Sequence, residues 1–377
     1  MEAFTFNTIE LVLLIIIGIL LLIQLFYYFG IYNRIHMRAR AIKRANVHFN
    51  TELPPISVII CASAEIENLR HNLTAVLNQD YPQFEVIVIN DGNMDESADY
   101  LTLLSEKYRN LYHSFVPDSS RYISRKKLAL TLGIKASKYD WLVFTEANCM
   151  PESDQWLRTL ARNFTSRAQV VLGYSGYKYS KGGLHKRVAF DNLFTSMRYL
   201  GCALAGHPYM GIGRNMAYKK ELFYEQKGFS AHLNLQRGGD DLFINQVATA
   251  ENTRIEIDKN AIISIQPISL AKDWREEKIG YRSTAKHYHG IQRYLMGFET
   301  TSRLLFHAAW TSTVTICLIN QNWIIAGITF LPFVLRYITQ AVIINQTAKD
   351  LGSKRRYYFT LPIFDILQPL QSLRWNL

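Results

Sequence analysis

Three short clusters of oxygen-bearing side chains, each beside an apolar run, are the residues of this sequence best suited to chemistry. Asp91 follows a run of branched apolar residues and precedes a glycine. A carboxylate at such a strand end can accept hydrogen bonds from a bound base or ribose, although an aspartate before a glycine is also common in turns. Glu146 and Asn148 follow a second apolar run, and Asp240 and Asp241 begin a third.

Glu146 and Asn148 are separated by one residue, so their side chains can point the same way and share a hard cation. Such a cation, Mg²⁺ or Mn²⁺, would bridge diphosphate oxygens and neutralise a leaving group. Because Asn148 offers only a neutral carbonyl oxygen, we expect weaker binding than two carboxylates would give. A loop of ordinary polar residues is the alternative interpretation.

Asp240 and Asp241 stand at the start of a helical pattern of apolar residues. Carboxylates are favoured at a helix N-terminus by the helix dipole, so simple capping is one interpretation. The other is that one carboxylate takes the proton from an acceptor hydroxyl group while its neighbour orients basic groups or water.

Basic and glycine-rich segments are less specific. Arg125, Lys126 and Lys127 can bind a diphosphate, or they can form a solvated helix start. Gly211 and Gly213 lack the third glycine of a dinucleotide-binding fingerprint. The four cysteines form no CxxC pair, which indicates a reducing compartment and no zinc site.

Strand-like and helix-like segments alternate between the clusters. Short branched apolar runs predict strands, and apolar residues at helical spacing predict the helices that follow them. This alternation predicts an α/β fold with a doubly wound, mainly parallel sheet, in which ligands bind beyond the carboxyl ends of the strands. The predicted strands are 56–62, 84–89, 111–116, 141–144, 170–174, 215–218, 254–257 and 261–265, and the predicted helices include 95–108, 126–138, 184–205 and an amphipathic helix at 274–294.

Three apolar stretches predict membrane helices. Residues 9–31 are long enough to cross a bilayer, and 304–319 with 323–344 form a predicted hairpin. Arg336 within the second arm is costly at bilayer depth unless it faces protein, which leaves a re-entrant or interfacial pair as the alternative. Basic residues follow both membrane segments, so the middle of the chain is expected on the cytoplasmic side.

The net charge of +11 then indicates contacts with anionic membrane lipids and phosphorylated ligands. No basic stripe with interleaved aromatic residues is present, so nucleic acid is not an expected partner.

Taken in order, the motifs resemble glycosyltransferase family 2, the inverting enzymes of GT-A fold, and in particular bacterial membrane-anchored members. Asn90-Asp91-Gly92-Asn93 is similar to the family's "DDGS" element, and 144–151 to its "TDADxxP" metal strand. Residues 211–223 are similar to "GRNxAYRxxLF", and Gly239-Asp240-Asp241-Leu242 stands where the family has "GEDxxL". The resemblance covers roughly residues 54–294.

This resemblance implies an enzyme that moves a sugar from a nucleotide-sugar donor, a UDP-sugar, to a hydroxyl group of a membrane-associated or lipid-linked acceptor. Asp241 would be the base, and a divalent cation would assist. The resemblance assigns catalysis to Asp241 and Asp240, nucleotide-sugar binding to Asp91, Glu146, Lys127 and Ala62, the acceptor side to Gly213, Arg214, Asn215 and Arg282, and the metal to Glu146 and Asn148.

The implied organisation is multi-pass in the inner (plasma) membrane, with the catalytic domain in the cytoplasm. The expected segments are a membrane helix (1–33), a basic linker (34–53), a GT-A-like domain (54–270), an amphipathic interfacial segment (271–303), a membrane hairpin (304–345) and a basic, apolar tail (346–377).

Departures from the family pattern leave a second hypothesis open. Glu146 and Asn148 replace both metal-strand aspartates, and Gly280 falls near the place of an expected arginine, which Arg282 can replace. The alternative is a catalytically degenerate GT-A-like membrane protein that acts as a binding or scaffolding partner. A nucleotidyltransferase is disfavoured because no glycine-rich basic loop follows Ile60. Under the preferred hypothesis, Asp91, Glu146 and Asp241 converge on one rim of the sheet.

Overall fold

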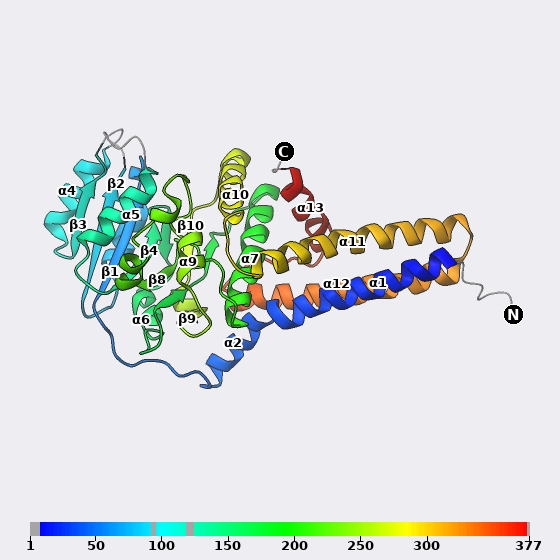
Figure 1. Ribbon diagram of the computed structural model, residues 1–377. Coiled ribbons are helices and arrows are strands. Elements are labelled where there is room, and N and C mark those ends of the chain that lie inside the picture. The colour runs from blue at the N-terminus through cyan, green and yellow to red at the C-terminus, as the bar shows by residue number, and fades with distance from the viewer. Residues whose placement is uncertain (1–7, 92–95, 118–123, 375–377) are drawn as a thin grey trace.

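The computed structural model describes residues 8–91, 96–117 and 124–374, with side chains described as far as 371. A globular α/β part holds the predicted nucleotide-binding elements, and a bundle of long helices projects from it (Figure 1). Gly92 and Asn93 of the "DDGS"-like element and Asp95 at the predicted helix start lie outside the described residues.

A seven-stranded sheet in the order β3-β2-β1-β4-β8-β6-β9 forms the centre of the globular part. The first four strands in that order are parallel, β8 runs antiparallel to both of its neighbours, and β6 pairs with β9 in parallel. The predicted α/β class with a doubly wound, mainly parallel sheet is therefore confirmed. The strands are β1 (Ile56–Ala62), β2 (Phe84–Asn90), β3 (Leu111–Phe115), β4 (Trp141–Glu146), β6 (Val170–Leu172), β8 (Met216–Lys219) and β9 (Thr253–Ile255).

Helices cover both faces of this sheet, which explains why its strands are apolar almost throughout. The residues of β1 alternate between two buried clusters, one containing Ile59 with α5 and the other containing Val58 with α3. Gly133 of α5 lies so close to β1 that an added Cβ would come 2.8 Å from Ile59 Cγ2, so glycine permits this approach. The covering helices are α3 (Ile66–Leu77), α4 (Ser97–Lys107), α5 (Arg125–Ala136), α6 (Trp156–Ala161), α8 (Lys220–Glu225) and α9 (Asp241–Val247).

A second, smaller sheet joins β5 (Cys149–Pro151), β10 (Ile263–Ile265) and β7 (Ser175–Tyr177) in the order β5-β10-β7. The sequence does not predict β5 or β7, each of which has three residues and no alternating pattern. The predicted helix at 184–205 is α7 (Gly183–Leu204).

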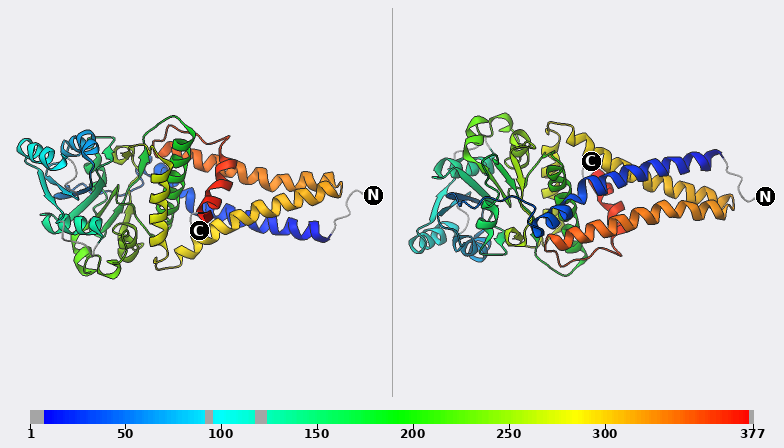
Figure 2. Two further views of the ribbon diagram at one scale, coloured as in Figure 1. Left: turned by 90° about the horizontal axis from the view of Figure 1, so that it is seen from above. Right: turned by 90° about the horizontal axis from the view of Figure 1, so that it is seen from below.

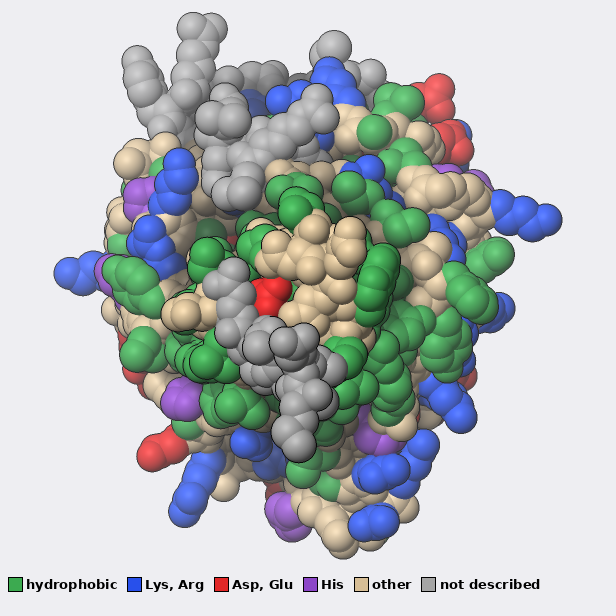
Figure 3. All heavy atoms as spheres, turned by 90° about the vertical axis from the view of Figure 1, so that its right-hand side faces the viewer, with side chains coloured by type: hydrophobic (Ala, Val, Ile, Leu, Met, Phe, Trp, Pro, Cys, Tyr) green, Lys and Arg blue, Asp and Glu red, His purple; other side chains and the backbone are tan. Residues whose placement is uncertain are grey.

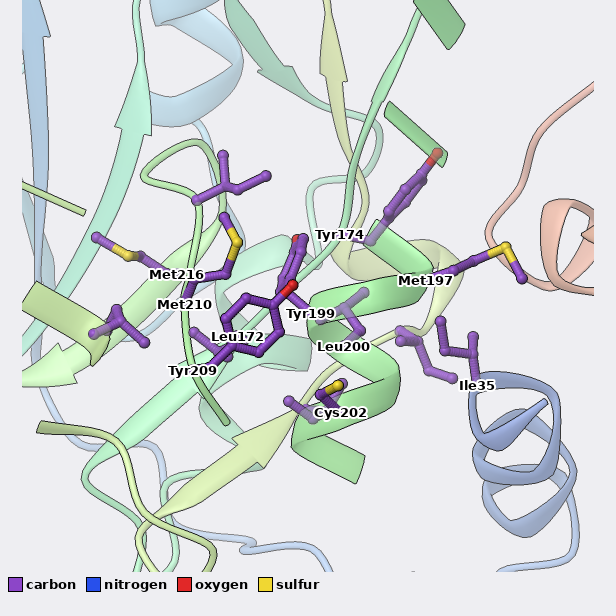
Figure 4. Close-up of a cluster of buried hydrophobic side chains, with 14 of the residues drawn as sticks. Ile35, Leu172, Tyr174, Met197, Tyr199, Leu200, Cys202, Tyr209, Met210 and Met216 are labelled. Carbon is purple, nitrogen blue, oxygen red and sulfur yellow. The ribbon is translucent and has the colours of Figure 1, made fainter. Parts of the chain in front are cut away.

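Helix α7 joins the sheet to the helices of the chain start. Tyr199 and Leu200 of α7 belong to one buried cluster with Leu172 of β6, and Ile35 of α2 (Arg34–Lys43) packs into the same cluster (Figure 4). Because this cluster is continuous, the bundle is fixed to the globular part through apolar contacts rather than joined by a free linker.

Three helices form the projecting bundle: α1 (Thr8–Tyr27), α11 (Gln292–Ile319) and α12 (Trp323–Asp350), which lie side by side in all views (Figures 1 and 2). Within the described residues, the stretch Thr8–Lys43 and α12 are long and apolar enough to cross a membrane, whereas α11 does not meet the same criteria. Viewed along the bundle, hydrophobic side chains gather at its centre and most Lys and Arg side chains lie towards the edge (Figure 3).

The predicted helix at 274–294 is divided in the structure. Helix α10 (Ala271–Ala285) ends before Gly290, whose φ of +96° a helix cannot accommodate, and α11 begins at Gln292. The chain turns here, so α10 packs against α9 while α11 enters the bundle. The tail forms α13 (Leu361–Arg374), which packs on α7 and α11.

Arg336 faces protein, which is the arrangement expected of a charge in a predicted membrane helix. It is 2% exposed, and its Nη1 donates to Asp365 Oδ2 of α13 at 2.7 Å. Asp365 also binds His307 at 2.7 Å and Gln340 at 2.8 Å.

Asp365→Ala should therefore destabilise the protein by about 3–5 kcal/mol, because it leaves the Arg336 guanidinium buried without its counterion. Thermal unfolding of the detergent-solubilised chain measures this loss. The double variant Arg336→Met, Asp365→Leu is the matched control and should recover much of it, since apolar residues replace both charges. A double variant as unstable as Asp365→Ala would contradict the role of the ion pair.

Candidate active site

Two adjoining cavities open at the carboxyl ends of β1, β2 and β4. The larger has a volume of about 420 Å³ and the smaller about 200 Å³. Cys61, Lys126, Glu146 and Asn148 line both, so the cavities form one continuous space, which we call the strand-end cleft. Ligands of doubly wound sheets bind at this edge.

Asp91 lies at the small end of the cleft. Its backbone N–H donates to the Ala62 carbonyl at 2.6 Å, which joins the ends of β2 and β1. Its carboxylate forms an ion pair with Arg125 at the start of α5 and is only 12% exposed. Ala62 lines the same cavity, so both predicted nucleotide-binding positions are at this end.

Glu146 lies at the centre of the cleft, between two cations. Lys126 Nζ is 2.6 Å from Glu146 Oε1, and Arg214 Nε donates to Oε2 at 3.1 Å. Burial alone raises the pKa of Glu146, but the charges of Lys126 and Arg214 outweigh this and lower it to about 2. Glu146 is therefore ionised, and its field raises the pKa of Lys126 above the ordinary value. Arg214 also binds Glu277 of α10 at 2.6 Å.

Lys127 lies beside Lys126 and also lines the large cavity, but its ammonium group is held by backbone carbonyls. Its side chain is 1% exposed, and its Nζ donates to the backbone carbonyls of His232 and, at 2.8 Å, Leu235. Burial lowers the pKa of Lys127 to about 8. Lys127 thus fixes the segment before α9, while Lys126 presents its ammonium group to the cleft. The sequence assigns nucleotide-sugar binding to Lys127, and in the structure the neighbouring Lys126 is the lysine whose ammonium group faces the ionised Glu146.

Asp240 and Asp241 face different ways. Asp240 lines the large cavity, and its Oδ2 accepts hydrogen bonds from Gly213 N at 3.0 Å and Tyr281 OH at 3.1 Å. Asp241 has no exposed surface and accepts hydrogen bonds from Thr284 and, at 2.7 Å, Tyr288. Burial and then the charge of Asp240 raise the pKa of Asp241 to about 7.

The expected convergence on one rim is met by Asp91, Glu146 and Asp240, whereas Asp241 lies behind the cleft. A one-residue step along a helix start turns the side chain by about 100°. The family motif assigns the base to the second carboxylate, Asp241. The packing of α10 against α9 determines that Asp240 is the carboxylate that reaches the cavity.

The acceptor-side residues also separate. Gly213 lines the cleft and supplies its N–H to Asp240, and Arg214 belongs to the ion network of Glu146. Asn215 is instead structural: it is 2% exposed, and its Nδ2 donates to the carbonyls of Tyr174 and Ala261 at 2.7 and 2.8 Å. Arg282 lines a different cavity, at the junction with the bundle.

Several further residues of the cleft are not among the site residues predicted from the sequence. Tyr281 and Glu277 come from α10, which packs over the cleft, and Arg237 comes from the segment before α9. A regular amphipathic pattern gives no sign that a helix covers a site, so only the packed structure assigns these residues.

A divalent cation fits this site only if the protein and a bound substrate both supply its ligands. Within the described ranges, no three His, Cys, Asp or Glu side chains form a metal-binding group. Glu146 supplies one ionised carboxylate and Asn148 one amide, both lining the cleft. Magnesium is commonly held by one or two carboxylates together with substrate phosphates, and this donor set suits that arrangement.

Comparison with solved structures gives the class of this fold. The mannosyltransferase PcManGT from Pyrobaculum calidifontis, solved in complex with GDP-Man and Mn²⁺, superimposes with a TM-score of 0.57 at 15% identity, over 92% of this chain and 100% of that one. The globular part therefore has a GT-A-like fold.

The sequence comparisons agree. The family described as "Glycosyl transferase family 2" matches residues 57–226, which include Asp91, Glu146 and Arg214. This segment, a little under half of the chain, is therefore similar to glycosyltransferase family 2.

Curated relatives match over part of their length. Glycosyltransferase AglE of Haloferax volcanii is 32% identical over 136 residues, which cover 35% of this chain and 42% of that protein. The poly-beta-1,6-N-acetyl-D-glucosamine synthase of Staphylococcus epidermidis is 29% identical over 129 residues, covering 34% of this chain and 29% of the synthase. The matched segment thus spans less than half of either relative.

Proposed function

We propose that this chain is an inverting glycosyltransferase that moves a sugar from a nucleotide-sugar donor, a UDP-sugar, to a hydroxyl group of a membrane-associated or lipid-linked acceptor. The continuity of the strand-end cleft carries this proposal. Asp91 lies at one end, Lys126 and Glu146 lie in the middle, and Asp240 lies at the other end. A nucleoside, a diphosphate and a sugar follow one another in the donor in the same order.

In this arrangement Asp91 accepts hydrogen bonds from the base. Lys126 forms an ion pair with Glu146 and lines the cleft. Its ammonium group donates to the diphosphate oxygens through a charge-assisted hydrogen bond. A divalent cation on Glu146 and Asn148, when bound, adds charge neutralisation of the diphosphate.

Asp240 takes the proton of the acceptor hydroxyl group as its oxygen attacks the anomeric carbon from the face opposite the diphosphate. The bond from the anomeric carbon to the diphosphate oxygen breaks, and the electron pair remains on the diphosphate. Gly213 and Tyr281 hold the Asp240 carboxylate in place. The products are the nucleoside diphosphate and the glycosylated acceptor with inverted configuration.

The membrane location belongs to the same proposal. The stretch Thr8–Lys43 and α12 are each long and apolar enough to cross a bilayer. Basic residues follow both. We place the globular part on the cytoplasmic side of the plasma membrane because the positive-inside rule favours it. Anchoring raises the local concentration of a membrane-held acceptor.

A transfer assay tests this function. Membranes that contain the chain are incubated with UDP-sugars and GDP-sugars labelled in the sugar, and label in extracted lipid is counted. Label from at least one UDP-sugar, lost in the Asp240→Asn variant, supports the proposal. Nucleotide binding with no transfer from any donor would favour the degenerate binding protein instead.

Asn148→Asp should lower the Mn²⁺ concentration that gives half-maximal activity by about tenfold, because a second carboxylate strengthens a shared cation site. A Mn²⁺ titration of transfer activity measures it. Asn148→Ala is the matched control and should raise that concentration. If neither substitution shifts the titration, the cation does not bind at these residues.

A further inference from the structure

A third cavity, of about 220 Å³, lies where the bundle meets the globular part. Its walls come from α7, α10, the start of α11, α13 and the segment 209–212. We call it the junction pocket. Nothing in the transfer chemistry described above uses it.

The junction pocket is strongly cationic. Among the side chains that the structure describes, one acidic residue, Asp191, lines it, together with five cationic ones: Arg198, Lys278, Arg282, Arg293 and Arg303. An excess of this kind attracts anions, and guanidinium groups favour phosphate oxygens in particular.

Part of this charge is neutralised by protein. Lys278 pairs with Asp191 at 2.7 Å. Arg198 and Arg303 lie 3.4 and 3.6 Å from Glu299, which is fully buried. Arg303 also lies 3.6 Å from Asp365. These three cations therefore have acidic partners.

Arg282 and Arg293 have no acidic partner: neither forms an ion pair with any residue that the structure describes. Arg282 Nη1 is buried and has no hydrogen-bond partner there. Burial without a counterion lowers the pKa of the Arg282 guanidinium. Buried donors of native proteins are almost always satisfied, so this one calls for an acceptor oxygen from a ligand.

The surroundings suit a ligand with an apolar tail. From the junction pocket, α11 runs outward along the bundle (Figure 1). Several large apolar residues of the two helices at the mouth, α11 and α13, are exposed, namely Phe298, Leu305, Ile366 and Leu370. A charged head in the pocket would leave an attached hydrocarbon chain beside these residues, at the depth of the membrane helices.

The junction pocket also adjoins the strand-end cleft. Tyr281 lines both cavities, and its hydroxyl donates to Asp240 at 3.1 Å. Tyr288 lines the pocket and donates to Asp241 at 2.7 Å. A group attached to a head bound in the pocket thus comes close to the carboxylate proposed as the base.

From this geometry we infer that the junction pocket binds the phosphate or diphosphate group of the lipid-linked acceptor, with Arg282 and Arg293 as its main ligands. The inference deepens the proposed function and rests on it, because only that function makes the bound lipid an acceptor. Arg282 and Arg293 are binding residues in this account, and they take no part in bond breaking.

Equilibrium binding to the full chain in a neutral detergent tests it. The probes are farnesyl phosphate, which carries a phosphate on a short isoprenoid chain, and farnesol, which lacks the phosphate. Farnesyl phosphate should bind at least about tenfold more tightly than farnesol, as expected when a charge-assisted hydrogen bond is formed. Arg282→Gln should remove about tenfold of that affinity.

Arg293→Gln is the second variant, and because Arg293 is exposed its replacement should leave folding intact. Arg109→Gln, an exposed charge in the turn before β3, is the matched control and should bind farnesyl phosphate like the wild type. Equal affinity for the two probes, or unchanged binding in both pocket variants, would overturn the inference.

Two further titrations separate the sources of failure. UDP binding reports on the strand-end cleft alone, so its loss with farnesyl phosphate binding intact contradicts the proposed function and leaves the phosphate site standing. Phosphatidylglycerol vesicles distinguish the acceptor from bulk lipid. Failure of phosphatidylglycerol to displace farnesyl phosphate supports an acceptor site, whereas full displacement would overturn it in favour of a general headgroup site.

Discussion

Asp240→Asn should lower kcat for sugar transfer by about 10²- to 10⁴-fold, the usual contribution of a positioned general base. Its carboxylate lines the large cavity and is held by Gly213 N–H and Tyr281 OH. An asparagine can accept both hydrogen bonds through its amide oxygen, so the fold and UDP affinity should persist while the proton acceptor is lost. Steady-state transfer kinetics with parallel UDP titration measure the two effects.

Asp241→Asn is the matched control for this prediction. The family resemblance assigns the base to Asp241, but the structure buries it beneath Thr284 and Tyr288. Its pKa is raised to about 7 by burial and by the Asp240 charge. Asp241 therefore loses its proton as pH rises through about 7, and the new negative charge makes Asp240 a stronger base.

Wild-type kcat should thus rise through neutral pH, and Asp241→Asn should flatten that rise with a smaller loss of rate than Asp240→Asn causes. A pH series from 5.5 to 9, roughly centred on the shifted pKa, records it. If Asp241→Asn is inactive and Asp240→Asn remains active, Asp241 is the base and the assignment to Asp240 is wrong.

Lys126→Met should weaken UDP binding by about 10- to 100-fold, because a hydrogen bond to a charged group contributes about 1.5–3 kcal/mol and the variant leaves the Glu146 charge facing the diphosphate. Uridine, which has no phosphate, should bind both proteins equally. Calorimetric titration with UDP and uridine measures this difference. Equal UDP affinity in the variant and the wild type would place the diphosphate elsewhere.

Lys127→Met distinguishes a structural role of Lys127 from a role in phosphate binding. The Lys127 ammonium group donates to the carbonyls of His232 and Leu235 inside the protein. Its loss leaves those carbonyls unsatisfied, so the variant should unfold at lower temperature while UDP affinity, measured below that temperature, is kept. The neighbouring lysines thus have opposite expected phenotypes.

The sequence predicts the first half of the fold well because its strands are buried on both faces. Residues 56–62 are β1, and β2 extends the predicted 84–89 by one residue. Short branched apolar runs of this kind are typical of strands that are buried on both faces of a parallel sheet. The three-residue strands β5 and β7 give no such signal, and their pairing with β10 depends on contacts far along the chain.

The site is predicted in part for a related reason. Asp91 and Glu146 lie at strand ends, and strand ends of one parallel sheet share an edge, so their convergence follows from topology. The choices between Lys126 and Lys127, and between Asp240 and Asp241, depend on side-chain direction at two helix starts. Packing of α10 against α9 and the carbonyls before α9 determine those directions, and no local pattern encodes them.

The predicted membrane segments show the same limit. Hydropathy predicts three apolar stretches, and the bundle contains three helices, but α11 is too polar along its length to qualify by composition as α12 does. Its buried Glu299 and Arg303 are accommodated by the counterions described above. The desolvation cost of burying these two charges is offset by their ion pairs, which the sequence does not reveal.

The most direct test is calorimetric titration of the full chain with UDP, compared with Asp91→Asn. We expect UDP to bind with one-to-one stoichiometry and Asp91→Asn to weaken UDP and uridine alike, because the amide NH₂ group that replaces one carboxylate oxygen cannot accept a hydrogen bond from the base. No heat of binding with UDP, or binding that is the same in Asp91→Asn, would contradict the claim that the strand-end cleft holds a nucleotide-sugar.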